Sequence, residues 1–286
     1  MKKTGYWIIA LVLNVIPMIS LAGGEDRVTG GRAVGLGWSA VTAFDVWSGA
    51  NNPAGMAWLN GWGAGAFASR QFLLKELSYE AVSMVWSGRP GAFGLAIGYY
   101  GFSAYNELFT GISYARKFGK RFGIGIQINY QRVAIAEGYG SKGMLSSKIG
   151  LAVTPDDHWT MGMTVSNPVP VKISDNPKEL LPLLFRLGVG YTIHNKVWFT
   201  IEGEKDLIRP VVIRSGIELT IATILTGRIG IATGPFIFTA GAGLKIKRWQ
   251  VDIATGYHLA LGFSPAVSLS WSPLLAQTAN QRKRKQ

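Results

Sequence analysis

The side chains that could support acid–base or nucleophilic chemistry are few. The chain has three histidines, His158, His194 and His258, and no cysteine. His158 and His194 flank predicted turns, so we expect both to be solvated. His258 is near Ser264 in the sequence, but strand geometry there gives no base–nucleophile pair of the kind a hydrolase needs. We therefore expect no catalytic residues and no enzyme activity.

Metal and nucleotide sites are also poorly indicated. The pair Asp156-Asp157 is better interpreted as a turn signal than as a pair of metal ligands. Gly35-Leu36-Gly37 and Gly241-Ala242-Gly243 are rich in glycine, but neither follows a buried strand and opens a helix, as a phosphate-binding loop does. The sequence predicts neither a metal site nor a cofactor.

Charged residues instead recur on one face of consecutive predicted strands. Neighbouring strands alternate in sign, and side chains on adjacent strands lie within reach of each other, so ion pairs across an inner wall are expected. This charge ladder consists of Arg186, Glu202, Glu204, Arg214, Glu218 and Arg228. Two roles stay open for it. Compensation of buried charge, which stiffens the wall, is preferred over a selectivity lining for a solute.

These charges require elements that send alternate residues to opposite faces. Between residues 122 and 131, aromatic and isoleucine side chains alternate with Gly, Gln and Asn. A period of two separates the two sets onto opposite faces of a strand, one suited to lipid and one to a polar lumen. Nearly every such segment carries Trp, Tyr or Phe at an end, which is typical of the aromatic girdles of membrane barrels. The sequence thus predicts an all-β, transmembrane antiparallel barrel.

The predicted barrel spans residues 61–271 and has about fourteen strands. An even number of strands places both termini in the periplasm, with short turns there and longer links such as 134–142 and 168–181 outside. The predicted strands are 61–70, 77–87, 92–102, 107–118, 121–133, 143–154, 158–167, 182–193, 196–205, 210–221, 224–233, 236–246, 248–259 and 264–271.

The first residues have the features of a secretory signal. Lys2 and Lys3 precede an apolar run over 6–19, and Ser20-Leu21-Ala22 fits a cleavage site, so we expect 1–22 to be removed on export. A membrane anchor is the alternative, but Asn14 and Pro17 interrupt the short run. Hydrophobic residues make up 48% of the chain, and they are spread along it as expected for many short strands.

The formal net charge is +13, and part of it lies in a basic tail over 272–286, which we expect in the periplasm. An exported chain meets no genome, so nucleic acid is not an expected partner. We expect lipid or a partner protein near the tail instead.

Residues 23–60 break the alternation and are rich in Gly and Ala, which permit close backbone approach. Asn52-Pro53-Ala54-Gly55 is the most specific element, because Asn-Pro favours a turn or a helix start. A compact segment of small residues ahead of a barrel predicts a plug inside the periplasmic mouth.

This segment resembles a known group of proteins. Gly31-Arg32-Ala33, Gly35-Leu36-Gly37, Asp45 and Asn52-Pro53-Ala54-Gly55 are similar to the start of FadL-type and PorV/PorQ-type outer-membrane barrels. The resemblance implies a fourteen-stranded barrel with an internal plug. FadL-type members pass hydrophobic compounds, sometimes through a lateral gap in the wall, and PorV/PorQ-type members serve type IX secretion.

The resemblance also suggests a place for a lateral gap. Gly94, Gly98 and Gly101 in the predicted strand 92–102 could mark a kink that opens the wall, with ordinary close packing against the plug as the alternative. We expect transport of small hydrophobic or amphipathic compounds across the outer membrane. The alternative is an accessory or docking component of type IX secretion or of a surface-assembly complex. The expected partners are outer-membrane lipid and, for the alternative, secretion or surface-complex proteins.

Overall fold

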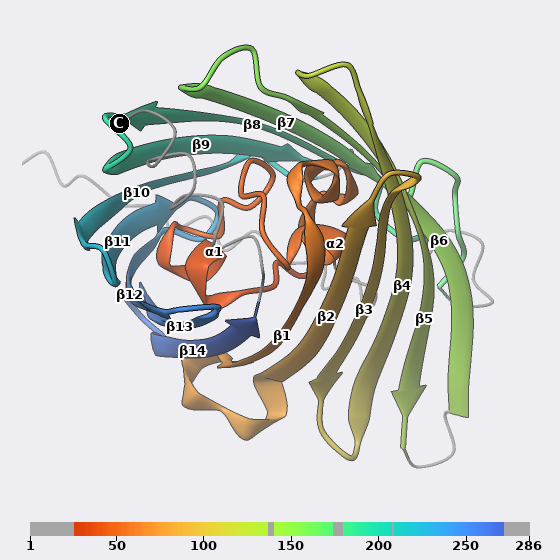
Figure 1. Ribbon diagram of the computed structural model, residues 1–286. Helices are drawn as coiled ribbons and strands as arrows, with labels where there is room; N and C mark the ends of the chain where they lie inside the picture. The colour runs from red at the N-terminus through yellow and green to blue at the C-terminus, as the bar shows by residue number, and fades with distance from the viewer. Residues whose placement is uncertain (1–25, 137–139, 174–179, 208, 272–286) are drawn as a thin grey trace, which may run out of the picture.

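The computed structural model describes residues 26–136, 140–173, 180–207 and 209–271. In these residues, fourteen antiparallel strands form a closed barrel in which each strand pairs with its sequence neighbours and β14 pairs with β1 (Figure 1). The all-β barrel and its strand number, predicted from the alternation, are confirmed. The strands are β1 (Gly61–Arg70), β2 (Ser78–Gly88), β3 (Gly91–Gly101), β4 (Tyr105–Phe118), β5 (Phe122–Ile135), β6 (Gly140–Val153), β7 (Trp159–Ser166), β8 (Leu184–Ile193), β9 (Val197–Lys205), β10 (Val212–Ala222), β11 (Leu225–Ala232), β12 (Ile237–Ile246), β13 (Trp249–His258) and β14 (Gly262–Trp271).

The two ends of the barrel differ. β1 begins and β14 ends at the end that carries short turns, such as 119–121 and 247–248, which we call the turn end. The opposite end, the loop end, carries the longer connections, including 167–183 and a β1–β2 connection with two short 3-10 helices, η2 (Gln71–Leu73) and η3 (Lys75–Leu77). The expected signal peptide and basic tail lie outside the described residues.

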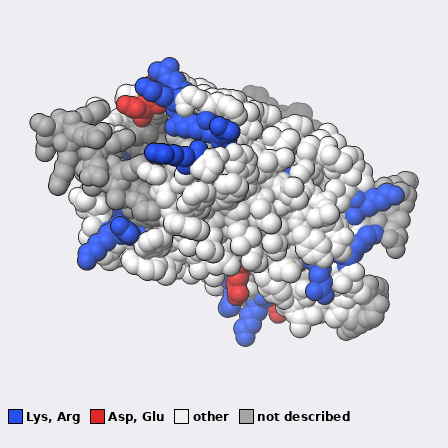
Figure 2. All heavy atoms as spheres, turned by 45° about the vertical axis from the view of Figure 1, so that its right-hand side comes forward, with Lys and Arg blue, Asp and Glu red and all other residues white. Residues whose placement is uncertain are grey.

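The outer face of the wall is apolar. Ile128 on β5, Leu187 on β8 and Ile253 on β13 are 60%, 62% and 62% exposed, although each sits in the middle of its strand. In Figure 2 the middle of the visible face is almost free of charge, and Lys and Arg gather towards its two ends. Such a belt is costly in water and suited to lipid. The closed wall leaves no sheet edge unpaired within that belt, so the chain is an integral barrel of the outer-membrane type.

Aromatic rings mark the turn end of the belt. Trp62 and Trp86 lie side by side on β1 and β2, with ring centroids 6.2 Å apart, and Trp159 and Trp249 are exposed at the same end. Indole rings are favoured where lipid meets water, so these residues fit one membrane interface. Among the described residues, no helix has the length and apolar character needed to span a membrane.

Residues 26–60, called the plug below, lie inside the barrel (Figure 1). Its helices are short: α1 (Gly31–Gly35), α2 (Ser48–Asn51) and the 3-10 helix η1 (Pro53–Trp58). Helices of this length are not stable alone, so contacts with the wall must hold them. The side chains of Val34, Val46 and Trp47 pack against Phe67 and Tyr79 of β1 and β2.

The plug extends further along the lumen than the periplasmic mouth, where the sequence predicts it to lie. At the turn end, the Trp58 indole donates to Thr154 Oγ1 at 3.1 Å. At the loop end, the Arg27 guanidinium pairs with Glu107 Oε1 at 3.2 Å. The segment therefore occupies most of the height of the lumen, because its first described residues have charged partners near the loop end.

Candidate functional site

The Asn52-Pro53-Ala54-Gly55 motif joins the plug to the wall. Asn52 Nδ2 donates to the carbonyl of Val41 at 2.8 Å and to the carbonyl of Leu151 on β6 at 3.2 Å. Its Oδ1 accepts from the amide of Ala54 at 3.1 Å, which caps the start of η1. One side chain thus holds a plug turn, the start of a helix and a wall strand together.

Wall glycines make room for this motif. A Cβ at Gly125 on β5 would lie under 3.0 Å from the backbone of Pro53 and Ala54. A Cβ at Gly150 on β6 would overlap Asn52 Oδ1. Within the plug, a Cβ at Gly55 would lie 2.7 Å from the ring of Phe44. Close approach, and not chain flexibility, is what these glycines provide.

Gly125→Ala is therefore expected to push the plug away from β5 and to lower the free energy of unfolding by about 1–3 kcal/mol. The matched control is Gly203→Ala on β9, because a Cβ there meets nothing within 4 Å. Urea unfolding in detergent and protease cleavage within residues 26–60 would measure both effects. Equal unfolding and equal cleavage of the two variants would show that the position of the motif does not depend on the missing side chain at Gly125.

The charge ladder falls into two groups in the structure. In the first group, Arg186 Nε lies 2.5 Å from Glu204 Oε2. Arg214 Nη1 lies 2.9 Å from Glu204 and 3.2 Å from Glu202. In the second group, Arg228 Nε lies 2.6 Å from Glu218. All of these side chains point inward and are largely buried, so the pairs offset the cost of placing charge inside the barrel.

The plug completes the first group. Asp26 lies 2.7 Å from Lys148 Nζ and 3.4 Å from Arg186 Nη1. Glu202 Oε2 accepts from two plug amides, Ala40 N at 2.8 Å and Val41 N at 2.9 Å. Lys148 and Asp26 were not predicted. The alternation places Lys148 inward on β6, but its partner lies in a segment that has no period, so nothing in the sequence joined the two.

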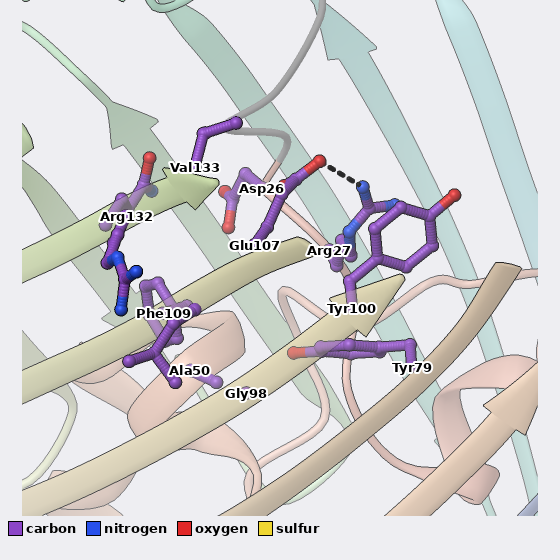
Figure 3. Close-up of a pocket in the computed structure, with 12 residues that line it drawn as sticks. Asp26, Arg27, Ala50, Tyr79, Gly98, Tyr100, Glu107, Phe109, Arg132 and Val133 are labelled. Carbon is purple, nitrogen blue, oxygen red and sulfur yellow. Dashed lines mark hydrogen bonds and ion pairs between the residues drawn. The ribbon is translucent and has the colours of Figure 1, made fainter. Parts of the chain in front are cut away.

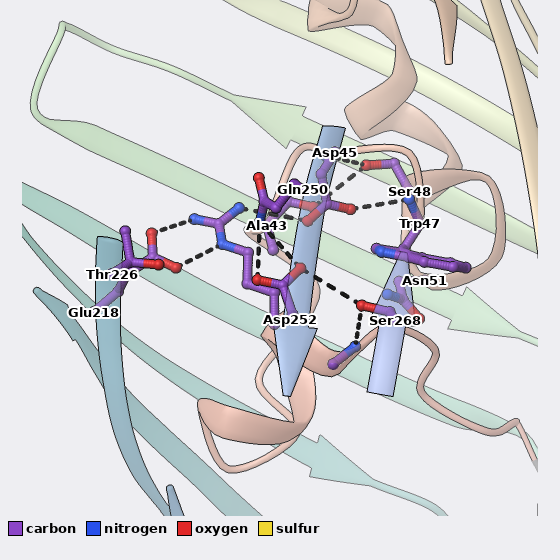
Figure 4. A network of polar contacts seen from close by, with 12 residues as sticks. Ala43, Asp45, Trp47, Ser48, Asn51, Glu218, Thr226, Gln250, Asp252 and Ser268 are labelled. Atoms are coloured by element: carbon purple, nitrogen blue, oxygen red, sulfur yellow. Dashed lines mark hydrogen bonds and ion pairs between the residues drawn. The ribbon is translucent and has the colours of Figure 1, made fainter. Parts of the chain in front are cut away.

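The second group also extends into the plug (Figure 4). The Arg32 guanidinium binds Glu218 through Nε at 2.9 Å and Nη2 at 3.0 Å. Arg32 Nη1 also lies 3.4 Å from Asp45. On the wall side, Arg228 Nη1 lies 2.7 Å from Asp252. Arg32 and Asp45 were singled out only as parts of a family pattern, and the structure shows what they contact.

The two plug carboxylates respond differently to their surroundings. Burial opposes ionisation of Asp26, but Lys148 and Arg186 outweigh it and lower its pKa from 3.8 to about 2. For Asp45, burial raises the pKa and Arg32 offsets this only in part. Asp26 is thus held as a stabilised anion, whereas the charge of Asp45 is a cost.

A carboxyl whose pKa is lower in the folded chain than in the unfolded chain stabilises the fold at pH values above the unfolded-state pKa. The stabilisation is lost as the pH falls towards the folded-state pKa. Asp26→Asn is therefore expected to lower the free energy of unfolding by about 2 kcal/mol at about pH 6 and by almost nothing near pH 2. The difference should disappear between pH 3.8 and about 2. Unfolding titrations of both chains across this range would measure it. A constant difference would mean that the Asp26 charge is not involved.

A pocket lies at the loop end, between the start of the plug and the inner faces of β2 to β5 (Figure 3). The Arg27 guanidinium lies 3.4 Å over the ring of Tyr100, and Tyr105 Oη donates to Glu107 at 2.8 Å. Its lining combines aromatic and aliphatic residues with this ion pair and with two further charged residues, Asp26 and Arg132. The lining residues are Asp26, Arg27, Ala50, Tyr79, Gly98, Tyr100, Glu107, Leu108, Phe109, Gln131, Arg132 and Val133.

The glycines suggested as a kink do not open the wall. β3 pairs in continuous register with β2 and with β4, and the pairing with β4 reaches Gly101. A Cβ at Gly94 would lie 2.6 Å from Met56 Sδ, and one at Gly98 would lie 2.8 Å from the Tyr79 ring. Gly101 has φ +102, which favours glycine at the strand end. The predicted lateral gap at this strand is therefore absent from this structure. Close packing explains Gly94 and Gly98.

The residues considered for chemistry have structural contacts. His258 Nδ1 accepts from the amides of Ala260 and Leu261, both at 3.2 Å. Ser264 Oγ accepts from the amide of Phe72 at 3.0 Å. Asp156 Oδ1 accepts from the amides at the start of β7, as a turn residue does. In the described ranges, no group of three or more His, Asp or Glu residues is placed to hold a metal ion.

Solved structures share this architecture. The CymD monoaromatic hydrocarbon channel superposes with a TM-score of 0.68 and 10% identity, covering 85% of this chain and 97% of its own. The fold is that of the FadL-type barrels. A Pseudomonas aeruginosa FadL homologue gives a TM-score of 0.67 at 10% identity, covering 87% of this chain and all 100% of that one. The Pseudomonas putida toluene transporter TodX gives 0.64 at 9% identity, covering 84% and 96%.

The FadL-type part of the resemblance drawn from residues 30–57 is thus confirmed for the fold. No protein-family model matches the chain, and no curated protein matches it in sequence. The secretion-accessory alternative and its partner proteins receive no support from these similarities, since the neighbours named above are described as a hydrocarbon channel, a FadL homologue and a toluene transporter.

Proposed function

We propose that this FadL-type barrel carries small hydrophobic or amphipathic compounds across the outer membrane. The observation that carries the proposal is the loop-end pocket, whose lining includes the rings of Tyr79, Tyr100 and Phe109 together with a few charged side chains. Apolar and aromatic walls with a few polar groups are typical of sites for small apolar ligands. Three structural neighbours are described as a hydrocarbon channel, a FadL homologue and a toluene transporter.

The filled lumen also limits what passes. The plug is buried against the wall, and its backbone carbonyls accept from Ser83, Ser113 and Lys148 on three wall strands. This packing favours a closed lumen over a wide, water-filled pore for ions or sugars. We assign the barrel no catalytic step and no cofactor. We place the short turns, both termini and the basic tail 272–286 in the periplasm, and we treat 1–22 as a cleaved signal.

The test must use a membrane that itself excludes apolar solutes, because a phospholipid bilayer dissolves them. Full-length protein is reconstituted into vesicles whose outer leaflet is lipopolysaccharide, and toluene entry is followed. Protein-containing vesicles are expected to take up toluene faster than protein-free vesicles, while sucrose entry stays unchanged. Equal toluene entry with and without protein would refute the proposal, and rapid sucrose entry would show an open pore instead.

A further inference from the structure

Four aromatic rings form a continuous row on the outer face of the wall near the turn end. Between ring centroids, Trp62 on β1 lies 6.2 Å from Trp86 on β2. Trp86 lies 5.8 Å from Phe93 on β3, and Phe93 lies 5.1 Å from Tyr114 on β4. Trp62 and Phe93 are 56% and 46% exposed, so the row faces away from the lumen. This aromatic row marks the level at which the apolar belt meets the headgroups of the membrane.

Three exposed cations lie just beyond the aromatic row, on two neighbouring turns. Arg89 is in the β2–β3 turn, and Lys120 is in the β4–β5 turn. Arg116 lies two residues beyond Tyr114 on the same outer face of β4. Tyr114 Oη donates to the carbonyl of Pro90 at 2.8 Å, which holds the β2–β3 turn against β4. Because β3 and β4 stay paired almost to this turn, Arg116 lies beside it.

The protein supplies little negative charge to this part of its rim. Among the residues that the structure describes, the exposed acidic side chains at the turn end are Asp156 and Asp157, on the β6–β7 turn. Asp156 Oδ1 already accepts from the amides of His158 and Trp159. Over the same described ranges, none of the three cations forms an ion pair. Their charge can therefore pair with an anion from outside the chain.

The position of the three cations defines the chemistry of that anion. A soluble acidic protein could reach the charges but not the aromatic row, because the row borders the lipid belt. A phospholipid reaches both, since its phosphate lies at the level of the cations and its glycerol and acyl chains lie against the rings. Guanidinium and ammonium groups form charge-assisted hydrogen bonds to phosphate oxygens. A headgroup without an ammonium of its own keeps its full negative charge for these contacts.

We propose that the aromatic row and the three cations form a site for an anionic phospholipid of the leaflet that surrounds the turn end. The site is separate from the plug and the lumen, so it does not depend on transport. The assignment to phospholipid uses the periplasmic position proposed above for the short turns, because the periplasmic leaflet of the outer membrane consists of phospholipid. The site would retain anionic lipid around β2 to β5 in preference to lipid of zero net charge.

A fluorophore on a single cysteine at position 124 can report on this lipid. Ile124 is the register partner of Arg116 and is 38% exposed on the outer face of β5. The full chain is placed in phosphatidylcholine vesicles that contain a small share of brominated phosphatidylglycerol or of brominated phosphatidylcholine. We expect brominated phosphatidylglycerol to quench as strongly as an about fivefold larger share of brominated phosphatidylcholine, the effect of roughly one basic side chain near a headgroup.

Charge variants locate the site. Arg89→Gln with Arg116→Gln should reduce the preference for phosphatidylglycerol to about that of random mixing, and Arg89→Gln alone serves if the double variant does not fold. Arg116→Lys keeps the charge and should keep the preference. The matched control is Lys196→Gln, because Lys196 is an exposed cation on the β8–β9 turn, away from the aromatic row. Lys196→Gln should leave the preference unchanged.

Equal quenching by the two lipids would overturn the inference and would leave an acidic protein as the partner of the cations. A preference that survives in the double variant, or that is lost equally in Lys196→Gln, would also overturn it, since net charge alone would then attract the lipid. Reversal of the preference by inorganic phosphate at constant ionic strength would assign the site to a free anion instead. Both leaflets of the vesicles have the same composition, so the result depends neither on orientation nor on the toluene entry measured above.

Discussion

Glu202→Leu is expected to release the plug from the wall and to lower the free energy of unfolding by about 3–5 kcal/mol. Glu202 is 1% exposed and accepts from the amides of Ala40 and Val41, and its other oxygen lies 3.2 Å from Arg214. Leucine fills similar space but leaves two plug amides without an acceptor and Arg214 with one fewer carboxylate. Two buried amides without an acceptor, together with weaker charge compensation of Arg214, which keeps Glu204 at 2.9 Å, are a large cost for a fold.

The control is Glu202→Gln, which keeps one acceptor oxygen for the plug amides of Ala40 and Val41 and replaces the oxygen that faces Arg214 by an uncharged NH2 group. Glu202→Gln should lower the free energy of unfolding clearly less than Glu202→Leu does. Urea unfolding in detergent reports the stability of the barrel, and protease cleavage within 26–60 reports release of the plug. If Glu202→Leu cleaves and unfolds like the unmodified chain, the contacts between Glu202 and the plug do not hold it in place.

Ile128→Arg tests the opposite face of the wall. Ile128 lies in the middle of β5 and is 60% exposed on the outer surface. An arginine at the midplane of a bilayer costs about 2–4 kcal/mol, and the cost falls to about 0–1 kcal/mol near the interface. We therefore expect Ile128→Arg to lower the free energy of unfolding strongly when unfolding is measured in lipid vesicles. Phe118→Arg, at the turn end of β4, should lower it only slightly. Equal, small losses would mean that the outer face is not embedded in lipid.

The wall was predictable because each strand residue makes a local choice between lipid and lumen. On β5, the inward Gln127, Asn129 and Gln131 alternate with the outward Ile126, Ile128 and Tyr130, and this order alone sets the register of the faces. The strand bounds consequently differ from the structure by only a few residues. The inward charges on β8 to β11 followed from the same rule.

The contacts of the plug could not be obtained in this way. Asp26 and Lys148 are joined only by the folded chain, and the plug has no periodicity that would point one residue toward the wall. The glycines of β3 show the same limit. A glycine that makes room for Met56 or Tyr79 has the same sequence signal as one that bends a strand, so the partner must be seen before the two are distinguished.

The central claim is that one wall separates lipid outside from a filled lumen inside. The chain has no cysteine, so single cysteines can be placed at Ile128, Asn129, Tyr130 and Gln131 and labelled with a small fluorophore. In vesicles containing brominated lipid, we predict strong quenching at Ile128 and Tyr130 and weak quenching at Asn129 and Gln131. Quenching that is uniform along the four positions, or strongest at Asn129 and Gln131, would contradict the account.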